Sequence, residues 1–518
     1  MANPNEPTNL RTLGALRASG YRVLPVKDEL RKNLIEKLRR GENIFPGIIG
    51  YERTVVPQIQ NAVLGRHDMI LLGLRGQAKS RIIRMLPELL DEFIPVVAGS
   101  EINDDPFAPI SKYARDLIDE RGDETPIEWL HRSQRYGEKL ATPDTTIADL
   151  IGDIDPIKAA HQRLTYADER VIHFGIIPRT NRGIFAINEL PDLQPRIQVG
   201  LLNIMEEQDI QIRGFNIRFP LDVLMVFSAN PEDYTNRGNI ITPLKDRIDS
   251  QILTHYPRTV EIGVEITRQE AWQDRADGAG EAVRVHVPHY FREIVEQVAF
   301  EARQSEYVDQ KSGVSARMTR AALEDLISAA ERRALVAGEA ETTVRVSDLV
   351  HVEPAVTGKV ELVYEGEQEG AQNVARLLVG RAVNAIFKRY FPDPSDKKEG
   401  RSPYQPVLAW FAQGHRVDVR PDMPFADYAK ALDQVEGLHE LVRRHTSPSS
   451  PAETASAMEF VLEALHQNSL LGKDVVEGTG GAYSDMMGSM LSSLGSFGED
   501  DDAGEDDEDE DDFYGRYR

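Results

Sequence analysis

The chain has no cysteine among its 518 residues. This absence excludes disulfide bridges, thiolate metal sites and cysteine nucleophiles, and it favours a reducing compartment such as the cytoplasm. The 12 histidines are scattered and show neither HxxxH nor HExxH spacing, which a helical zinc site would need. Chemistry based on a thiolate or on a resident zinc ion is therefore not expected.

Long apolar runs are also missing. No stretch approaches the ~18 apolar residues of a membrane span, and the start of the chain, MANPNEPTNLRTLGALRASG, lacks the apolar segment of a signal peptide. We therefore expect a soluble, cytoplasmic protein without a membrane partner. With 41% hydrophobic residues, a chain of this length is expected to fold into about two to four domains.

Positive charge is scarce, and the formal net charge is −25. Because clusters of Lys and Arg carry the attraction to nucleic acid, this balance disfavours a general phosphate-backbone binder. Much of the negative charge lies in EDDDAGEDDEDEDD, from Glu499 to Asp512, which has nothing apolar to bury and is expected to be disordered. Two roles stay open for this tail: solubility, or docking to a basic or metal-binding partner.

The pattern of the chain predicts five segments. Residues 1–44 contain an amphipathic helix over 27–40, and residues 45–258 alternate short buried strands with helices, as in an α/β parallel sheet with helices on both faces. Residues 259–356 indicate a helical domain, residues 357–470 a further helical region, and residues 471–518 a flexible tail rich in Gly, Ser and Met and then in acid.

The clearest predicted strands are nearly continuous apolar runs, which indicates burial on both faces. The long polar stretch between the second and third of them, about residues 104–177, is expected to form helical insertions. The predicted strands are Met69–Leu72, Ile94–Ala98, Gly183–Ile187, Val223–Ser228 and Gln251–Leu253.

The first of these strands runs into GLRGQAKS, which has the parts of a phosphate-binding loop. Gly73 and Gly76 allow a tight turn and close backbone approach, Lys79 can reach the β and γ phosphates, and Ser80 can ligate Mg²⁺. Ala78 stands where G-x-x-x-x-G-K-[ST] has its last Gly. Alanine fits there if its φ is negative and is strained if its φ is positive.

The strand in GIFAINEL ends in two polar residues, where a P-loop ATPase has an Asp for the Mg²⁺ shell and a Glu that polarises the attacking water. Here Asn188 replaces the Asp, and Glu189 is present. Asparagine can accept a hydrogen bond from a metal-bound water but carries no charge, so metal binding should be weakened more than catalysis.

Three more polar residues follow in a fitting order. Asn230 ends the strand of DVLMVFSAN, where it can orient the lytic water. Arg247, in ITPLKDRID, precedes the last strand and can reach a neighbouring subunit's site, and Arg317, in SARMTRAAL, begins a helix of the next domain. Each alone is compatible with a surface or capping role, but their joint order is not expected by chance.

These stretches together resemble an AAA+ ATPase of the branch that holds the magnesium chelatase I subunit and the MoxR-type ATPases. The resemblance spans about Phe45 to Pro257 and is followed by the helical lid. It is carried by FPGIIGYE, GLRGQAKS, TPDTTIADLIGDIDPIKAA, FGIIPRTNRGIFAINELPDL, EEQDIQIRGFNIRFP, SANPEDYTNRG and PLKDRID.

The resemblance implies a role for each matched residue. It makes Lys79 and Ser80 the Walker A pair, Asn188 and Glu189 Walker B, Asn230 sensor 1, Arg247 the arginine finger and Arg317 sensor 2. Glu189, Asn230, Arg247 and Arg317 are then catalytic, and Ser80 and Asn188 serve the metal. The implied nucleotide-binding residues are Ile48, Ile49, Gly50, Gly73, Gly76, Gln77, Ala78, Lys79, Ser80 and Arg81.

The family further implies ATP and Mg²⁺ as cofactors and a homo-hexameric ring with sites between subunits. It also implies a partner protein with a von Willebrand A domain, remodelled in metal insertion or cofactor maturation. QDIQIRGFNIRFP and TPDTTIADLIGDIDPIKAAHQ would face the ring pore. On their own they are equally typical of a surface hairpin and an amphipathic helix.

Some features depart from the family. Ala78 and Asn188 put nucleotide affinity and rate in question, residues 107–139 lengthen the Walker A to Walker B spacing, and the region after Glu353 has no counterpart in the chelatase subunit. Two alternatives stay open: an ATP-binding scaffold with little turnover, and a nucleic-acid motor. The acidic composition and the single Arg213 in the hairpin turn disfavour the motor.

Overall fold

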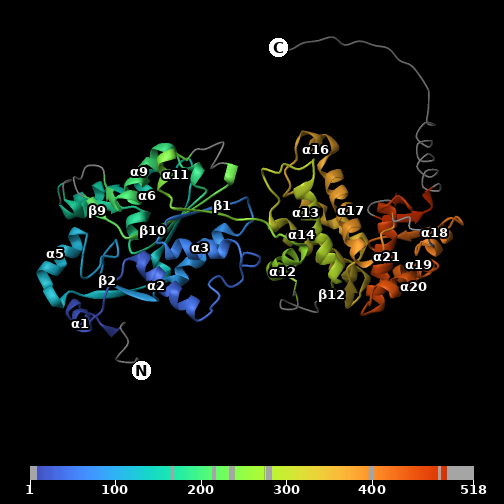
Figure 1. Cartoon of the computed structure of the whole chain (residues 1–518), viewed down its shortest axis with the longest axis horizontal. Coiled ribbons are helices and arrows are strands. Elements are labelled where there is room, and N and C mark those ends of the chain that lie inside the picture. Colours follow the sequence, from blue (N-terminus) through green and yellow to red (C-terminus); the bar gives the residue numbers. More distant parts are fainter. Residues whose placement is uncertain are drawn as a thin grey trace, which may run out of the picture. The chain divides into compact units, whose positions relative to one another are not determined.

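The computed structural model describes residues 9–163, 165, 168–212, 218–232, 240–273, 275, 283–395, 402–476 and 480–486. The chain divides into two compact units, Met1–Gln269 with Gln310–Ala316, and Glu270–Asp309 with Arg317–Arg518 (Figure 1). The acidic segment 499–512, and Arg213 with the turn of its predicted hairpin, lie outside the described residues. No helix within the described ranges is long and apolar enough to cross a membrane.

The first unit is built on a five-stranded parallel sheet. Apolar side chains along the central strands bury both faces, so their backbone groups find partners only in neighbouring strands. Four of the predicted strands are confirmed here. In spatial order the strands are β11 (Ser250–Leu253), β1 (Met69–Leu72), β10 (Val223–Ala229), β7 (Gly183–Asn188) and β4 (Tyr136–Leu140).

Ile94–Ala98 was predicted to be a strand of the parallel sheet, and this prediction was wrong. Strand β2 (Phe93–Val97) pairs antiparallel with β3 (Ile127–His131) in a separate two-stranded sheet. The fifth parallel strand is β4, which lies in the stretch expected to be helical. The reason is that β4 is an edge strand: its YGEKL sequence mixes polar and apolar residues, unlike a strand buried on both faces.

Helices cover both faces of the sheet, as expected (Figure 1). One core includes side chains of α2 (Val26–Arg39), α3 (Val55–Leu64) and α4 (Lys79–Met85). The other includes side chains of α6 (Ile147–Leu150), α9 (Pro195–Glu206) and α11 (Thr242–Arg247). Successive strand residues alternate between the two cores, which is the period of two of a β-strand.

Shorter elements complete the first unit. Two small antiparallel pairs lie after α6 and after α9, and the second of them, β8 with β9, flanks the undescribed hairpin turn. These elements are α1 (Leu13–Ala18), α5 (Lys112–Arg121), β5 (Gly152–Ile154), α7 (Pro156–Gln162), β6 (Ile172–Phe174), α8 (Ile176–Arg179), β8 (Asp209–Gln211), β9 (Arg218–Pro220) and α12 (Val260–Glu270).

The second unit is mainly helical and contains two small sheets. Strands β12 (Arg284–His286) and β13 (Glu341–Thr343) pair in parallel, and β14 (Val417–Val419), β16 (Gly480–Ser484) and β15 (Gly472–Val476) form an antiparallel sheet. The helices are α13 (His289–Gln304), α14 (Ala316–Ala337), α15 (Glu353–Thr357), α16 (Tyr364–Glu369), α17 (Ala371–Tyr390), α18 (Gln405–Phe411), α19 (Phe425–Asp433), α20 (Leu438–His445) and α21 (Pro451–Gln467).

The prediction that the flexible tail begins at residue 471 was wrong. Residues 472–476 and 480–484 form strands, although the composition after 471 suggested a loose segment. Tyr483 is fully buried and donates a hydrogen bond to Glu463 at 2.7 Å, while the Lys473 ammonium lies 2.6 Å from the same carboxylate. This buried contact attaches the segment to α21, because each polar group finds its partner there.

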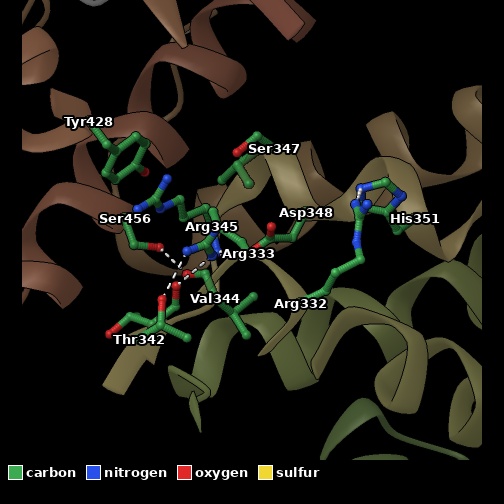
Figure 2. A network of polar contacts seen from close by, with 12 residues as sticks. Arg332, Arg333, Thr342, Val344, Arg345, Ser347, Asp348, His351, Tyr428 and Ser456 are labelled. Atoms are coloured by element: carbon green, nitrogen blue, oxygen red, sulfur yellow. Dashed lines mark hydrogen bonds and ion pairs between the residues drawn. The ribbon is translucent and has the colours of Figure 1, made fainter. Parts of the chain in front are cut away.

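A buried polar network joins three elements of the second unit (Figure 2). Arg333 of α14 lies 2.8 Å from Asp348 and donates to Thr342 at 2.8 Å, and both members of the ion pair are nearly inaccessible. Ser456 of α21 donates to the Val344 carbonyl at 2.7 Å. Since every partner is buried, the loop after β13 is held in one arrangement.

A second buried ion pair ties α2 to the strand that the sequence did not reveal. Arg135, just before β4, contacts both Glu29 carboxylate oxygens at 2.7 and 2.6 Å and donates through Nε to the Arg182 carbonyl. Glu29 also accepts from the Asp91 backbone N–H. Only 1% of the Arg135 side chain and 4% of the Glu29 side chain is exposed.

We expect Arg135→Met to lower the free energy of unfolding by about 3–5 kcal/mol, because it leaves the buried Glu29 carboxylate without its cation. Urea denaturation of the whole chain measures this. The matched control is Arg17→Met, which breaks the exposed ion pair with Asp123 and should change stability by at most about 1 kcal/mol. Equal effects of the two substitutions would contradict the assignment.

Candidate nucleotide-binding site

The predicted site residues of the first unit follow the carboxyl ends of neighbouring strands. The loop 73–78 follows β1, Asn188 ends β7 and Glu189 comes next, and Asn230 follows β10. Because these strands are parallel and adjacent, their carboxyl ends meet at one edge of the sheet. The structure therefore brings residues from three distant parts of the chain to one place.

The two predicted loop glycines are required by close contacts. A Cβ on Gly73 would lie 1.8 Å from Thr254 Oγ1, and a Cβ on Gly76 would lie 2.2 Å from Ser315 Oγ. Gly76 also has a φ of +76°, which disfavours other residues. Both positions thus allow the backbone to approach its neighbours as a tight turn needs.

The sequence left the sign of φ at Ala78 open, and in the structure this φ is positive. Its φ of 58° and ψ of 14° are left-handed, and it caps the start of α4. A non-glycine residue in this region costs on the order of 1 kcal/mol. The missing third glycine is therefore a source of local strain in the loop.

The Lys79 ammonium lies inside the loop. Only 7% of this residue is exposed, and Nζ donates to the carbonyls of Gly73 and Leu74, the latter at 3.2 Å. Burial lowers the pKa of Lys79, and the nearby Glu189 carboxylate opposes that shift. The Lys79 cation thus lies within electrostatic reach of the carboxylate predicted to polarise water. Ser80 and Arg81, the next two residues, are exposed.

Side chains that the sequence did not single out support the loop. Thr254, after β11, donates to the buried Gln77 side chain at 2.6 Å, and Tyr51 donates to the Gln77 carbonyl at 3.0 Å and to the His255 carbonyl at 2.6 Å. Burial raises the pKa of Tyr51 to about 12. The only signal in the sequence was the polar end of the last strand, LTHY.

The predicted adenine-side segment leads into Tyr51. Ile48 is buried, Ile49 is half-buried, and Gly50 has a φ of +83°. A Cβ on Gly50 would lie 2.8 Å from Ile262 of α12. The segment therefore lies between α12 and Tyr51, the residue that contacts the loop, within the first unit.

Asn188 is held from both sides. Its Nδ2 donates to Glu138 of β4 at 2.5 Å, and its Oδ1 accepts from the Ser228 hydroxyl of β10 at 3.1 Å. The next residue, Glu189, has a φ of 54° and donates its backbone N–H to the same hydroxyl at 3.3 Å. This left-handed turn changes the direction of the chain between the two predicted Walker B positions.

The sequence analysis did not single out Glu138. Its carboxylate accepts the hydrogen bond from the Asn188 amide. Arg84 of α4 contacts both of its oxygens, at 2.8 and 3.0 Å, and Tyr136 donates to it at 3.1 Å. Burial acts to raise the pKa of Glu138, but the hydrogen bonds from Arg84, Tyr136 and Asn188 outweigh it and lower that pKa. The group is therefore an anion at neutral pH.

The two predicted arginines lie on other elements. Arg247 ends α11, donates to the Pro243 carbonyl at 2.9 Å and forms an ion pair with Glu206 of α9. Arg317 is the second residue of α14 and belongs to the second unit, whereas the preceding residues 310–316 belong to the first. In that segment, the Gly313 carbonyl accepts from Arg75 of the loop at 3.4 Å.

The residues at this edge fit a nucleotide with Mg²⁺. The Ser80 hydroxyl and the Asn188 amide are oxygen donors of the kind that Mg²⁺ prefers. Over the described residues, no group of three or more His, Asp or Glu could hold a metal alone.

No family model matches the chain. Among solved structures, NtrX from Brucella abortus in complex with ADP is similar at 16% identity over 74% of this chain and 69% of that chain, with a TM-score of 0.35. A protein of Cytophaga hutchinsonii, provisionally described as an ATPase, is similar at 15% identity over 70% and 97%, with a TM-score of 0.28.

A complex between the magnesium chelatase subunits BchI and BchD, based on a single-particle cryo-EM reconstruction, is similar at 22% identity over 62% of this chain and 98% of that chain, with a TM-score of 0.32. This chain spans 56% of a further NtrX structure.

The order of the parallel strands and the loop between β1 and α4 are those of a P-loop nucleotide-binding fold. The motifs of the sequence resemble those of the magnesium chelatase I subunit and the MoxR-type ATPases.

Ala78→Gly should raise the free energy of unfolding by on the order of 1 kcal/mol, because glycine adopts the positive φ without strain. Thermal and urea unfolding of the whole chain measure the change. Ala160→Gly is the matched control: Ala160 is exposed inside α7, so the same substitution should cost up to about 1 kcal/mol. A loss of stability at both positions would contradict the strain at Ala78.

Proposed function

We propose that the chain is a ring-forming, homo-hexameric ATPase that couples hydrolysis of Mg-ATP to the remodelling of a partner protein. The observation that carries this proposal is the buried Lys79 ammonium, enclosed by the loop carbonyls and close to Glu189. A cation buried in a backbone loop at a helix start is suited to hold phosphate oxygens. Fold and site together point to phosphoryl transfer.

The loop residues would bind the nucleotide. Lys79 would exchange its two carbonyl acceptors for β- and γ-phosphate oxygens, which are stronger acceptors because they are charged. Ser80 and Asn188 would hold the metal, and Ile48, Ile49 and Gly50 would lie on the adenine side. Bound Mg²⁺ would supply charge neutralisation between the phosphates.

Glu189 would polarise the attacking water, and Asn230 would orient it. A water-activating carboxylate has to lie beside the γ-phosphate without binding it, and the left-handed backbone at Glu189 turns the chain away from the strand at that point. Arg317 would touch the γ-phosphate from the second unit and respond to its loss.

Arg247 would act in the neighbouring subunit's site. Its partner within the same chain is Glu206, whose side chain is 56% exposed. Such exposed ion pairs contribute about 0–1 kcal/mol, so the guanidinium can leave Glu206 at small cost when a neighbour offers a γ-phosphate. This geometry supports a finger that is inactive in an isolated chain.

The output would be mechanical: loss of the γ-phosphate would move the helical unit against the sheet and change a bound partner. The sequence resemblance supports a partner with a von Willebrand A domain and a role in metal insertion or cofactor maturation in the cytoplasm. A second candidate, an ATP-binding scaffold with little turnover, is favoured by the strained Ala78 and the uncharged Asn188.

Lys79→Ala should reduce steady-state phosphate release by about 10²–10³-fold, because the phosphates lose their buried cation. The matched control is Lys112→Ala, which removes an ammonium from an exposed i,i+4 pair in the same unit and should leave the rate unchanged.

The same assay separates the two candidates. For the ATPase, Glu189→Gln abolishes turnover while nucleotide binding persists. For the scaffold, the wild-type rate is already at the level of Glu189→Gln. If wild type turns over ATP and Lys79→Ala keeps that rate, the ATPase proposal fails.

Sites shared between subunits predict complementation. Arg247→Ala and Lys79→Ala should each be inactive alone, since a finger contributes about 10³–10⁵ in rate. An equal mixture should recover about a quarter of the wild-type activity, because about that share of random interfaces joins an intact loop to an intact finger. Phosphate release after co-assembly measures this. No recovery, with assembly confirmed by sedimentation, contradicts a finger acting in trans.

A further inference from the structure

We propose that Glu138 supplies the carboxylate that is missing at position 188, and that it acts through Asn188 as a positioning residue of the metal–phosphate site. This inference rests on the proposed function, because it concerns the same site. It assigns a role to a residue of the edge strand β4, outside the motifs recognised in the sequence.

The pairing of β4 with β7 places the two side chains on one face of the sheet. Leu140 lies opposite Asn188, and Glu138 lies opposite Ala186. Because alternate residues share a face, Glu138 and Asn188 both lie on the face of Ala186. That face carries the core that includes α4, the helix after the phosphate loop.

Charge fixes which way the Asn188 amide points. An ionised carboxylate only accepts hydrogen bonds, so the amide NH₂ has to face Glu138. The amide oxygen is then turned toward Ser228 of β10. Since β10 lies between β7 and β1, the oxygen faces the side of the phosphate loop. Glu138 thus presents the one atom of Asn188 that can accept from a metal-bound water.

Helix α4 brings the predicted metal ligand close to this pair. Ser80 and Arg84 are four residues apart on α4 and share one side of it, with Cβ atoms separated by about 5–6 Å. Arg84 contacts the Glu138 carboxylate. The residue that binds the Glu138 carboxylate therefore lies one helical turn after the residue whose hydroxyl would ligate the metal.

The ion pair with Arg84 offsets only part of this charge. The Arg84 side chain is 63% exposed and the Glu138 side chain 20%, so water screens the guanidinium more than the carboxylate. If Glu138 served only the stability of the fold, its ion pair with Arg84 would be sufficient. The hydrogen bond to a Walker B position adds a second, directional function, like that of the partners which orient metal ligands.

The test measures the affinity of the whole chain for AMP-PNP by calorimetry, once with EDTA and once with Mg²⁺. The ratio of the two dissociation constants gives the effect of the metal on binding. Glu138→Gln should reduce this ratio about tenfold, because the positioning of the metal shell is lost. Metal-free AMP-PNP should bind at least as tightly as to wild type, because a negative charge near the phosphates is removed. A merely structural defect would weaken both.

The rescue variant is Glu138→Gln with Asn188→Asp. The new amide at 138 donates to the new carboxylate at 188, so the hydrogen bond is kept with its polarity reversed, and the ratio should return to within about threefold of wild type. The matched control is Glu88→Gln, a glutamate of the same unit paired with Arg132, which should leave the ratio unchanged. Glu138→Asp replaces Glu138→Gln if the latter unfolds, with an intermediate loss expected.

The outcomes separate the two proposals. If wild type binds no AMP-PNP with Mg²⁺, the proposed function fails and this inference with it. If wild type shows a metal effect that Glu138→Gln leaves unchanged, or if the double variant is no better than Glu138→Gln, only the role of Glu138 is overturned.

Discussion

Burial of a parallel sheet on both faces is the constraint on which the first unit depends. Because helices cover both faces, backbone groups of the strands can only pair with one another, and the polar side chains of the inner strands lie near the strand ends. Parallel strands put their carboxyl ends on one edge, so the loop after β1, Asn188 and Asn230 have to come together there. The site is a consequence of how the sheet is buried.

Two local features at that edge depart from the usual P-loop motifs, and contacts from distant residues hold both in place. The strained backbone at Ala78 is held by hydrogen bonds of Tyr51 and Thr254 to the neighbouring Gln77. The uncharged Asn188 is held by Glu138 from the next strand. Both supports come from residues far away in sequence, which is typical of sites where strain is stabilised by the surrounding fold.

The sequence predicted the central strands, the phosphate loop and the helix before the sheet, because each is a local pattern of apolar or glycine residues. It missed β4, since an edge strand such as Tyr136–Leu140 lacks the apolar run of a buried one. It also took residues after 471 for a loose tail, although Tyr483 and Lys473 find buried partners on α21. In both places, a partner from another part of the chain decides the structure.

The sequence by itself determined the class of fold, the order of the motifs and the chemical groups that could serve them, because composition and short-range spacing fix these. Only the tertiary structure decided the sign of φ at Ala78, the enclosure of Lys79 and the pairing of Asn188 with Glu138. These depend on strand register and on contacts between residues such as Tyr51 and His255, which lie about 200 positions apart. No local pattern encodes such contacts, because they arise only when the sheet closes.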